Sequence, residues 1–337
     1  PRPLPPADLS QPEAIQKAVF KARLELAELN GYAHAIPNPL LLMSPWVVRE
    51  AVASSEIENI NTTILLALQN QLLPQNSRSG PDKEVLRYRD AMIWGYENMA
   101  QLPLSERLIR GVHAQLLPES EGFRRTQNFI QNSLTREVIF TPPPPGEVPG
   151  LISDLEVFIH EDQSGLDPLV KAAMTHYQFE AIHPFTDGNG RTGRILIVLQ
   201  LIHEQILRYP ILYISGYIIR HKQMYYRLLR EVSQNHTWTE FILFFLEAFY
   251  QQSKQTKDVL FAVMEYREQF RDKFRQELPA LFSVDLTDEL FSHPVITAPK
   301  LAEHLGIHRS TALRYLHALA AAGFLQARQE GKRQFYL

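Results

Sequence analysis

Apolar residues recur every three or four positions along most of this chain, the spacing of helices that bury one face. The first such segment carries Ile15, Val19, Ala22 and Leu26 on one side, and Gly31 is its expected C-cap. The pattern predicts helices over 13–30, 47–53, 82–99, 105–117, 151–160, 168–182, 195–206, 221–233, 239–252 and 257–276. The fold class is therefore expected to be mainly α.

A short interval in the middle of the chain follows a different pattern. Residues 126–130 and 137–141 are rich in β-branched and aromatic residues and flank Asn132-Ser133, which predicts a β-hairpin. Pro142–Pro145 should end the hairpin, because proline cannot continue a ladder of backbone hydrogen bonds. A second proline-bounded stretch, 37–45, is expected to be a loop.

The C-terminal segment predicts a winged helix-turn-helix. Two short helices, 300–305 and 309–322, are separated by Gly306-Ile307-His308, and two strands, 324–328 and 333–337, follow them. From Lys300 onward the chain has six basic and two acidic residues, whereas the whole protein carries a net charge of −3. Such modules bind DNA or dock proteins, so possible partners are DNA, another protein and a second copy of this chain.

Composition narrows the class of protein. The chain has 337 residues, of which 45% are hydrophobic and 21% charged, as in ordinary globular proteins with two or three domains. It contains no cysteine, which excludes disulfides, thiol nucleophiles and thiolate metal sites and fits a cytoplasmic location. No apolar run approaches the ~20 residues that a membrane span needs, so no membrane partner is expected.

The stretch from His183 to Arg194, HPFTDGNGRTGR, contains several residues that can bind phosphate or take part in catalysis. His183 titrates near neutrality and is a natural proton acceptor. The glycine turn Gly188–Gly190 precedes an apolar helix, so its backbone N–H groups can cradle an anion at a helix N-terminus. Arg191 and Arg194, three apart on that helix, can both reach phosphate oxygens. The stretch therefore predicts a nucleotide site.

Asp187 adds a hard oxygen ligand beside this cradle, as Mg²⁺ bound to a di- or triphosphate requires. One alternative uses the same residues. The stretch from Gly188 to Gly193 also satisfies G-x-G-x-x-G, the dinucleotide fingerprint, but that motif must follow a β-strand. The preceding segment, 169–182, is rich in alanine with helical spacing, which disfavours the dinucleotide interpretation.

The same stretch resembles the signature of the Fic family, H-P-F-x-[DE]-G-N-G-R-x-x-R, at every fixed position. Fic proteins mostly transfer AMP from ATP to a hydroxyl of a target protein. The resemblance implies that His183 deprotonates the target and that Asp187 holds Mg²⁺. It implies that Arg194 grips the γ-phosphate and that Arg191 balances charge on the α- and β-phosphates. The implied nucleotide site comprises Gly188, Asn189, Gly190, Arg191, Thr192, Gly193 and Arg194.

A second motif resembles the inhibitory pattern of many Fic proteins, [ST]-x-x-x-E-[GN]. It is formed by Ser54, Glu58 and Asn59, N-terminal to the signature. Glu58 can form a charge-assisted pair with Arg194 and occupy the space that the γ-phosphate needs. The resemblance therefore implies an autoinhibited enzyme, whereas a simple surface ion pair is the alternative.

Two weaker resemblances complete the site. Fic proteins carry a flap that aligns the target segment through backbone pairing, and the predicted strand supplies Val138, Ile139, Phe140 and Thr141 at that position. Arg124 lies in the run that leads into this flap. Tyr225 and Tyr226 resemble a tyrosine pair that lines the adenosine pocket. Core packing is the alternative for the flap residues and for the tyrosine pair.

The whole prediction is a Fic-type helical bundle with a small hairpin flap and a C-terminal winged helix-turn-helix domain. Its expected parts are an N-terminal inhibitory region 1–80, a catalytic core 81–255, a connecting helix 256–284 and the winged domain 285–337. Its expected partners are ATP, with Mg²⁺, and a target protein with an exposed Tyr, Thr or Ser. Three alternatives remain: removal of AMP, transfer of another nucleotide, and DNA-binding regulation.

Overall fold

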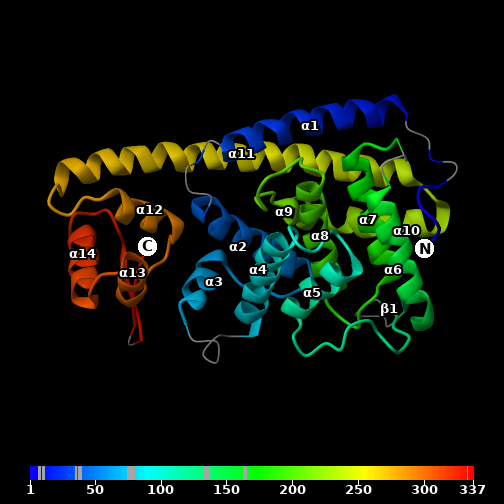
Figure 1. The fold of residues 1–337 in the computed structure, drawn as a ribbon, viewed down its shortest axis with the longest axis horizontal. Helices are drawn as coiled ribbons and strands as arrows, with labels where there is room; N and C mark the ends of the chain where they lie inside the picture. The colour runs from blue at the N-terminus through cyan, green and yellow to red at the C-terminus, as the bar shows by residue number, and fades with distance from the viewer. Residues whose placement is uncertain are drawn as a thin grey trace.

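The structure is a computed structural model that describes residues 1–6, 9, 12–34, 36, 40–73, 80–131, 137–161, 165–331 and 333–337. The mainly helical fold class is confirmed (Figure 1). The helices are α1 Glu13–His34, α2 Leu40–Ile57, α3 Ile64–Gln71, α4 Gly80–Asn98, α5 Glu106–Leu116, α6 Val148–His160, α7 Pro168–Ile182, α8 Asn189–His203, α9 Ile214–Arg220, α10 Lys222–Asn235, α11 Trp238–Glu277, α12 Val284–Ser292, α13 Ala298–Leu305 and α14 Arg309–Ala321. The strands are β1 Ile130–Gln131, β2 Val138–Phe140, β3 Ala327–Glu330 and β4 Arg333–Tyr336.

Helices α7 and α8 form the centre of the larger hydrophobic core. Nearly every side chain of α7 is buried, and α8 is buried from Arg191 to Leu201. Helices that are apolar all round lie in the interior of a bundle, with other helices covering them. The loop that joins them, 183–188, is thereby fixed at both ends to the best-packed part of the molecule.

Helix α11 runs the full length of the molecule, and α1 lies along its first half (Figure 1). The sequence predicts two helices here with a break after residue 252, and this prediction is wrong. Gln252, Ser253 and Thr256 are polar yet buried within one continuous 40-residue helix. They interrupt the apolar pattern without interrupting the backbone. The expected domain boundary between residues 255 and 256 therefore falls inside a helix.

Helix α11 joins two separate cores. Its first half contributes Phe241, Phe245 and Phe249 to the main core. Its end contributes Phe270 and Phe274 to a smaller core made with α12, α13 and α14. Figure 1 shows these three helices grouped beneath the far end of α11. No helix of the described residues is long and apolar enough to span a lipid bilayer.

Several predicted boundaries are wrong. Helix α1 continues through Gly31 to His34, and Gly31 has no positive φ, so it is not a C-cap. The expected loop 37–45 is helical from Leu40, and Pro45 lies inside α2. Residues 37–39 lie outside the described residues. Helices α3, α9 and α12 had no sequence prediction because each is too short to show a clear period.

The predicted hairpin exists but is small. Ile130 pairs with Phe140 and Gln131 with Val138 in an antiparallel ladder. Asn132 and Ser133, its expected turn, lie outside the described residues. The exposed edge carries Val138 and Ile139, 47% and 40% exposed, while Phe140 packs against the main core. Two outward-facing apolar residues on a short ladder are available for pairing with another segment.

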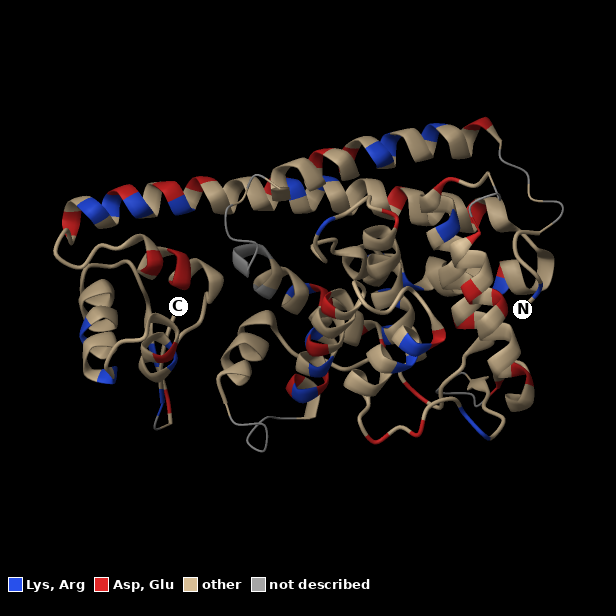
Figure 2. Ribbon diagram, viewed as in Figure 1, with Lys and Arg blue, Asp and Glu red and all other residues tan. Residues whose placement is uncertain are grey.

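The C-terminal helices and strands occur in the order that a winged helix requires. Gly306, with a φ of 63°, ends α13, and β3 pairs with β4. The strand begins at Ala327, three residues later than predicted. Arg309, Arg314 and Arg333 are exposed, and Figure 2 shows basic positions along α14. Gln69 of α3 donates to Glu330 of β3 at 2.9 Å, which ties the hairpin to the main body. DNA binding and self-association remain predictions.

The continuity of α11 generates a test at Lys254, an exposed residue in its middle. Lys254→Pro should lower the free energy of unfolding by about 3 kcal/mol, because proline removes a helical hydrogen bond and clashes with the preceding turn. Lys254→Ala is the matched control and should change stability little. Urea unfolding monitored by circular dichroism measures both. Equal stability of the two variants would mean that the helix is broken at this point.

Candidate active site

The loop between α7 and α8 is held in two left-handed backbone conformations. His183 ends α7 with a φ of 51°, and Gly188 precedes α8 with a φ of 76°. Glycine adopts such angles readily, whereas histidine does so only when its surroundings enforce it. The first N–H groups of α8, from Asn189 to Arg191, have no acceptor within the helix and are available to an anion.

Arg124 enforces the conformation of His183. Its guanidinium donates from Nε to the carbonyl of His183 at 2.9 Å and from Nη2 to the carbonyls of Pro143 and Ile182. Its own backbone N–H donates to the carbonyl of Pro184 at 2.9 Å. Arg124 is buried, so these contacts fasten the start of the loop from behind. The sequence associated Arg124 with the flap, and its contacts show that it also positions His183.

His183 is partly buried, and burial, followed by the nearby Arg124 charge, lowers its pKa to about 4. Its Nδ1 lies 3.3 Å from the carbonyl of Glu180. A neutral imidazole whose Nδ1–H faces a carbonyl leaves Nε2 as the proton acceptor. His183 is therefore a base that is unprotonated across the neutral range.

Asn189 and Thr192 hold the loop with their side chains. The amide of Asn189 donates to the carbonyl of Phe185 at 2.8 Å, and its oxygen accepts from the N–H of Phe185 at 2.9 Å. The hydroxyl of Thr192 donates to the carbonyl of Gly188 at 2.9 Å. Both side chains are buried, so Asn189 would contact a phosphate through its backbone N–H, whereas the N–H of Thr192 already donates to the carbonyl of Gly188.

His113 of α5 supports the same loop from below. Its ring stacks on Phe185, with centroids 3.6 Å apart and planes 3° from parallel. Its Nε2 lies 2.9 Å from the carbonyl of Asp187. Nothing in the sequence connected His113 with a signature that begins 70 residues later. Helix packing brings them together.

Asp187 and Arg191 lie at the mouth of the cradle. The side chain of Asp187 is 75% exposed, and Oδ1 accepts from the N–H of Gly188 at 2.7 Å. Arg191 is buried, and its Nη1 donates to Oε2 of Glu84 on α4 at 2.8 Å. Its Nη2 lies 3.6 Å from Oδ2 of Asp187 in a second ion pair. An exposed carboxylate next to a phosphate cradle suits Mg²⁺, which is usually held by one or two carboxylates and by phosphate oxygens.

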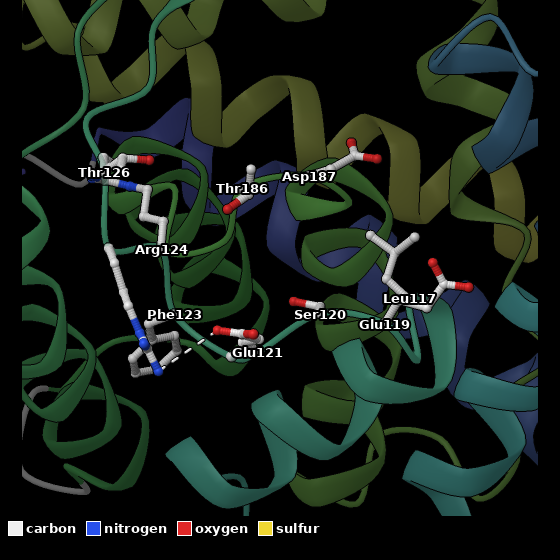
Figure 3. A pocket seen from close by; sticks show the side chains of 11 residues that line it. Leu117, Glu119, Ser120, Glu121, Phe123, Arg124, Thr126, Thr186 and Asp187 are labelled. Carbon is white, nitrogen blue, oxygen red and sulfur yellow. Dashed lines mark hydrogen bonds and ion pairs between the residues drawn. The ribbon is translucent and has the colours of Figure 1, made fainter.

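A cleft of about 440 Å³ opens directly beside Asp187 (Figure 3). Its wall is the segment after α5, where Glu121 and Arg125 form an exposed ion pair at 3.8 Å. The cleft is lined by Leu117, Glu119, Ser120, Glu121, Gly122, Phe123, Arg124, Arg125, Thr126, Thr186 and Asp187. It gives a solvent route from outside to the carboxylate that would carry Mg²⁺.

Arg194 is the buried cation of the site, with its side chain 1% exposed. Its Nε donates to the hydroxyl of Ser54 at 2.7 Å, and Nη2 donates to the Ser54 carbonyl at 2.9 Å and to Glu58 Oε1 at 2.8 Å. Burial is the largest effect and opposes the charged form, but Glu58 together with the nearby Tyr225, Tyr88 and Glu180 outweighs it and raises the pKa of Arg194 above its ordinary value. The structure thus brings together both predicted motifs.

The end of α2 aims Glu58 at this arginine. The N–H of Ile60 donates to the carbonyl of Ser55, and that of Asn59 to the carbonyl of Glu56, as in a Schellman C-cap. Asn59 has a φ of 63°, a conformation that favours Gly or Asn, the two residues that the motif allows. A Cβ on Gly190 would come within 2.3 Å of Glu58 Oε1, so only glycine leaves room for the carboxylate.

The predicted nucleotide-site residues Tyr225, Tyr226 and Gly193 differ in how far they are buried and in what they contact. Tyr225 is buried and its hydroxyl bonds to His176 at 2.9 Å, which is core packing rather than an open pocket wall. Tyr226 is 41% exposed, with its ring 5.2 Å from that of Tyr225. Gly193 lets α7 approach α8 closely, since a Cβ there would lie 2.4 Å from Glu180. An adenosine contact from either tyrosine remains a prediction.

Glu50, on the same helix as Ser54, is buried. It accepts from the N–H of Ser215 at 3.0 Å, from the Ser215 hydroxyl, and from Tyr88 at 3.2 Å. Burial raises its pKa to about 7 despite these hydrogen bonds. It connects α2 with α4 and α9, and local sequence patterns do not reveal this role because its partners are 38 and 165 residues away.

Family models match three consecutive parts of the chain. Residues 16–97 match the Fic/DOC family N-terminal model, residues 103–201 the Fic/DOC family model, and residues 266–337 the model named protein adenylyltransferase SoFic-like, C-terminal domain. The chain belongs to the Fic/DOC family. The middle match contains the complete signature, and the first contains Ser54, Glu58 and Asn59.

Two curated relatives are named as protein adenylyltransferases, one of them as a probable one. The chain is 36% identical over 117 residues to the protein adenylyltransferase Fic of Culex quinquefasciatus, covering 34% of this chain and 21% of that protein. It is 31% identical over 142 residues to a probable protein adenylyltransferase of Aquifex aeolicus, covering 41% and 40%. The chain therefore spans less than half the length of these relatives.

Solved structures show the same fold. A Fic family protein from Desulfovibrio desulfuricans aligns over 98% of this chain and 97% of its own, with a TM-score of 0.58 and 21% identity. A Fic domain containing signaling protein from Bacteroides thetaiotaomicron covers 74% of this chain and 95% of its own, with a TM-score of 0.56 and 20% identity. The first alignment extends into the C-terminal helices.

The buried carboxyl of Glu50 generates a prediction about stability. Its pKa in the folded state, about 7, exceeds its ordinary value of 4.5, so the folded state binds the proton more tightly. The free energy of unfolding should fall as pH rises from about 4.5 to about 7. The glutamine of Glu50→Gln stays neutral at every pH. The free energy of unfolding of this variant, relative to wild type, should therefore rise by up to about 3 kcal/mol across that interval.

Urea unfolding at several pH values measures this difference. Glu56→Gln, at an exposed position of the same helix, is the matched control and should follow wild type. A Glu50→Gln variant whose stability runs parallel to wild type at every pH would show that folding does not shift the pKa of Glu50.

Proposed function

We propose that this Fic protein transfers AMP from ATP to a hydroxyl side chain of a target protein, and that Glu58 restrains the reaction. The observation that supports the proposal best is the arrangement at Arg194. A buried guanidinium stands at an anion cradle, and a carboxylate from another helix occupies one side of it at 2.8 Å. The names of the relatives support the same activity.

The reaction would begin with the target hydroxyl next to His183. Nε2 of the neutral imidazole accepts the hydroxyl proton while the oxygen attacks the α-phosphorus. A new P–O bond forms to the target, the bond between the α-phosphorus and the bridging oxygen breaks, and pyrophosphate leaves. The α8 N-terminus and Arg191 stabilise the negative charge that develops on the phosphates.

Asp187 is the residue that would hold Mg²⁺, which would neutralise charge on the leaving pyrophosphate. The exposure of Asp187 and the cleft beside it fit this role. The hairpin supports the choice of a protein as the acceptor. Val138 and Ile139 point outward on a short ladder, where an extended target segment can add as a further strand.

Glu58 and the γ-phosphate would compete for one guanidinium. A triphosphate that cannot reach Arg194 loses a charge-assisted bidentate contact and with it the orientation of the α-phosphorus. Ser54 keeps its two contacts with Arg194 when Glu58 is absent, so the guanidinium stays in place. Removal of Glu58 therefore frees an arginine that is already positioned.

Glu58→Gly should raise the rate of AMP transfer about 10- to 100-fold, the equivalent of the ~1.5–3 kcal/mol that a hydrogen bond to a charged group contributes. Arg194→Ala in the same background should cancel the gain, because both changes act on one contact. The measurement is incorporation of labelled AMP into the protein itself and into lysate proteins. Glu56→Gly is the control. A gain that persists without Arg194 would contradict the restraint, and labelling by another nucleotide would revise the substrate.

His183→Ala in the Glu58→Gly background should lower the transfer rate by about 10²- to 10⁴-fold, because the general base is lost. ATP affinity, measured by calorimetry, should change little, since His183 precedes the cradle. With His183 present, the rate should stay level from pH 8 to about 5 and fall as the base is protonated near pH 4. Undiminished transfer by the alanine variant would remove His183 from the mechanism.

A further inference from the structure

Three side chains with metal-ligating atoms meet in the C-terminal body, away from the α7–α8 loop. Glu289 lies in the last turn of α12, His293 follows that helix as its C-cap, and His304 lies in the last turn of α13. One nitrogen or oxygen of each lies within 4.8 Å of the others. The neighbouring rings of His293 and His304 have centroids 4.6 Å apart.

Both histidines converge on one carboxylate oxygen of Glu289. Nδ1 of His293 lies 2.8 Å from Glu289 Oε1, and Nδ1 of His304 contacts the same oxygen. The His293 atom is buried and has no hydrogen-bond partner of acceptable geometry among the described residues. A buried nitrogen beside an anionic oxygen but not aligned with it is an arrangement that a shared cation would satisfy.

We propose that Glu289, His293 and His304 form a binding site for a divalent transition-metal ion, with Zn²⁺ as the expected occupant. Two imidazoles and one carboxylate suit Zn²⁺, whereas Ca²⁺ and Mg²⁺ prefer oxygen ligands throughout. Bonds of ~2.0–2.1 Å place neighbouring tetrahedral ligands about 3.3 Å apart. The side chains need to shift only slightly to reach that spacing.

The side chains remain 14%, 26% and 28% exposed, in the order Glu289, His293 and His304. A fourth position on the ion is therefore open to water. Both histidines offer Nδ1, and the ion would join α12 to α13 across the smaller core. The site is separate from the proposed AMP-transfer chemistry, so either proposal can fail without the other.

The test uses the full chain without an affinity tag, freed of metal by a chelator. Isothermal titration with Zn²⁺ measures stoichiometry and affinity, and Co²⁺ supplies a visible absorption spectrum that reports histidine coordination. The variants are Glu289→Gln and His304→Gln. His317→Gln is the matched control, an exposed histidine on α14 outside the cluster. Circular dichroism without metal checks that each variant folds as wild type does.

We expect one Zn²⁺ per chain, a Co²⁺ spectrum, and a rise in the melting temperature of wild type with metal. Glu289→Gln and His304→Gln should each weaken Zn²⁺ binding at least tenfold, by analogy with the loss caused by mutating groups that merely orient metal ligands. His317→Gln should bind as wild type. Equal affinity of wild type and the two cluster variants would overturn the proposal and leave a hydrogen-bonded Glu–His pair. A well-folded wild type without saturable binding would overturn it as well.

Discussion

The buried guanidinium of Arg194 is the interaction on which the site depends. A cation with 1% of its side chain exposed must have its charge balanced and its donors satisfied, since removing an arginine from water is costly. Ser54 supplies two acceptors and Glu58 supplies the opposing charge. The N-terminal part of the chain is therefore fastened to the signature helix through the residue that a nucleotide would need.

The geometry of α2 follows from this requirement. The carboxylate must reach the arginine at the end of the helix, so the helix stops at Ile57 and Asn59 turns the chain away. Gly190 gives the carboxylate room, and Glu50 anchors the middle of α2 to α4 and α9. A glycine in the signature, usually associated with phosphate approach, thus also makes room for the contact between Glu58 and Arg194.

The sequence predicted the local parts of this site and missed those that depend on tertiary packing. The signature and the Ser54–Glu58–Asn59 motif could be recognised because their residues stand at fixed short spacing. Helices α7 and α8 could be predicted because their apolar residues recur at helical spacing. His113 and Glu84 gave no signal, because each meets the signature only through helix packing. The continuity of α11 was missed because buried polar residues imitate a break in the apolar pattern.

The two signature arginines are held by different sets of acceptors, and the difference bears on the restraint proposed for Glu58. Arg191 donates to Glu84 and lies near Asp187, but both carboxylates are partly or largely exposed and water can replace them. Glu58 is exposed to a similar degree, at 35%, but Arg194 also donates to the buried hydroxyl and carbonyl of Ser54. Exchanging Glu58 for a phosphate keeps the buried charge balanced, whereas losing Glu58 without a phosphate does not. Under the proposed restraint, the nucleotide and the carboxylate of Glu58 are alternative counter-ions for one buried cation, and the γ-phosphate reaches Arg194 only where Glu58 has left it or has been removed.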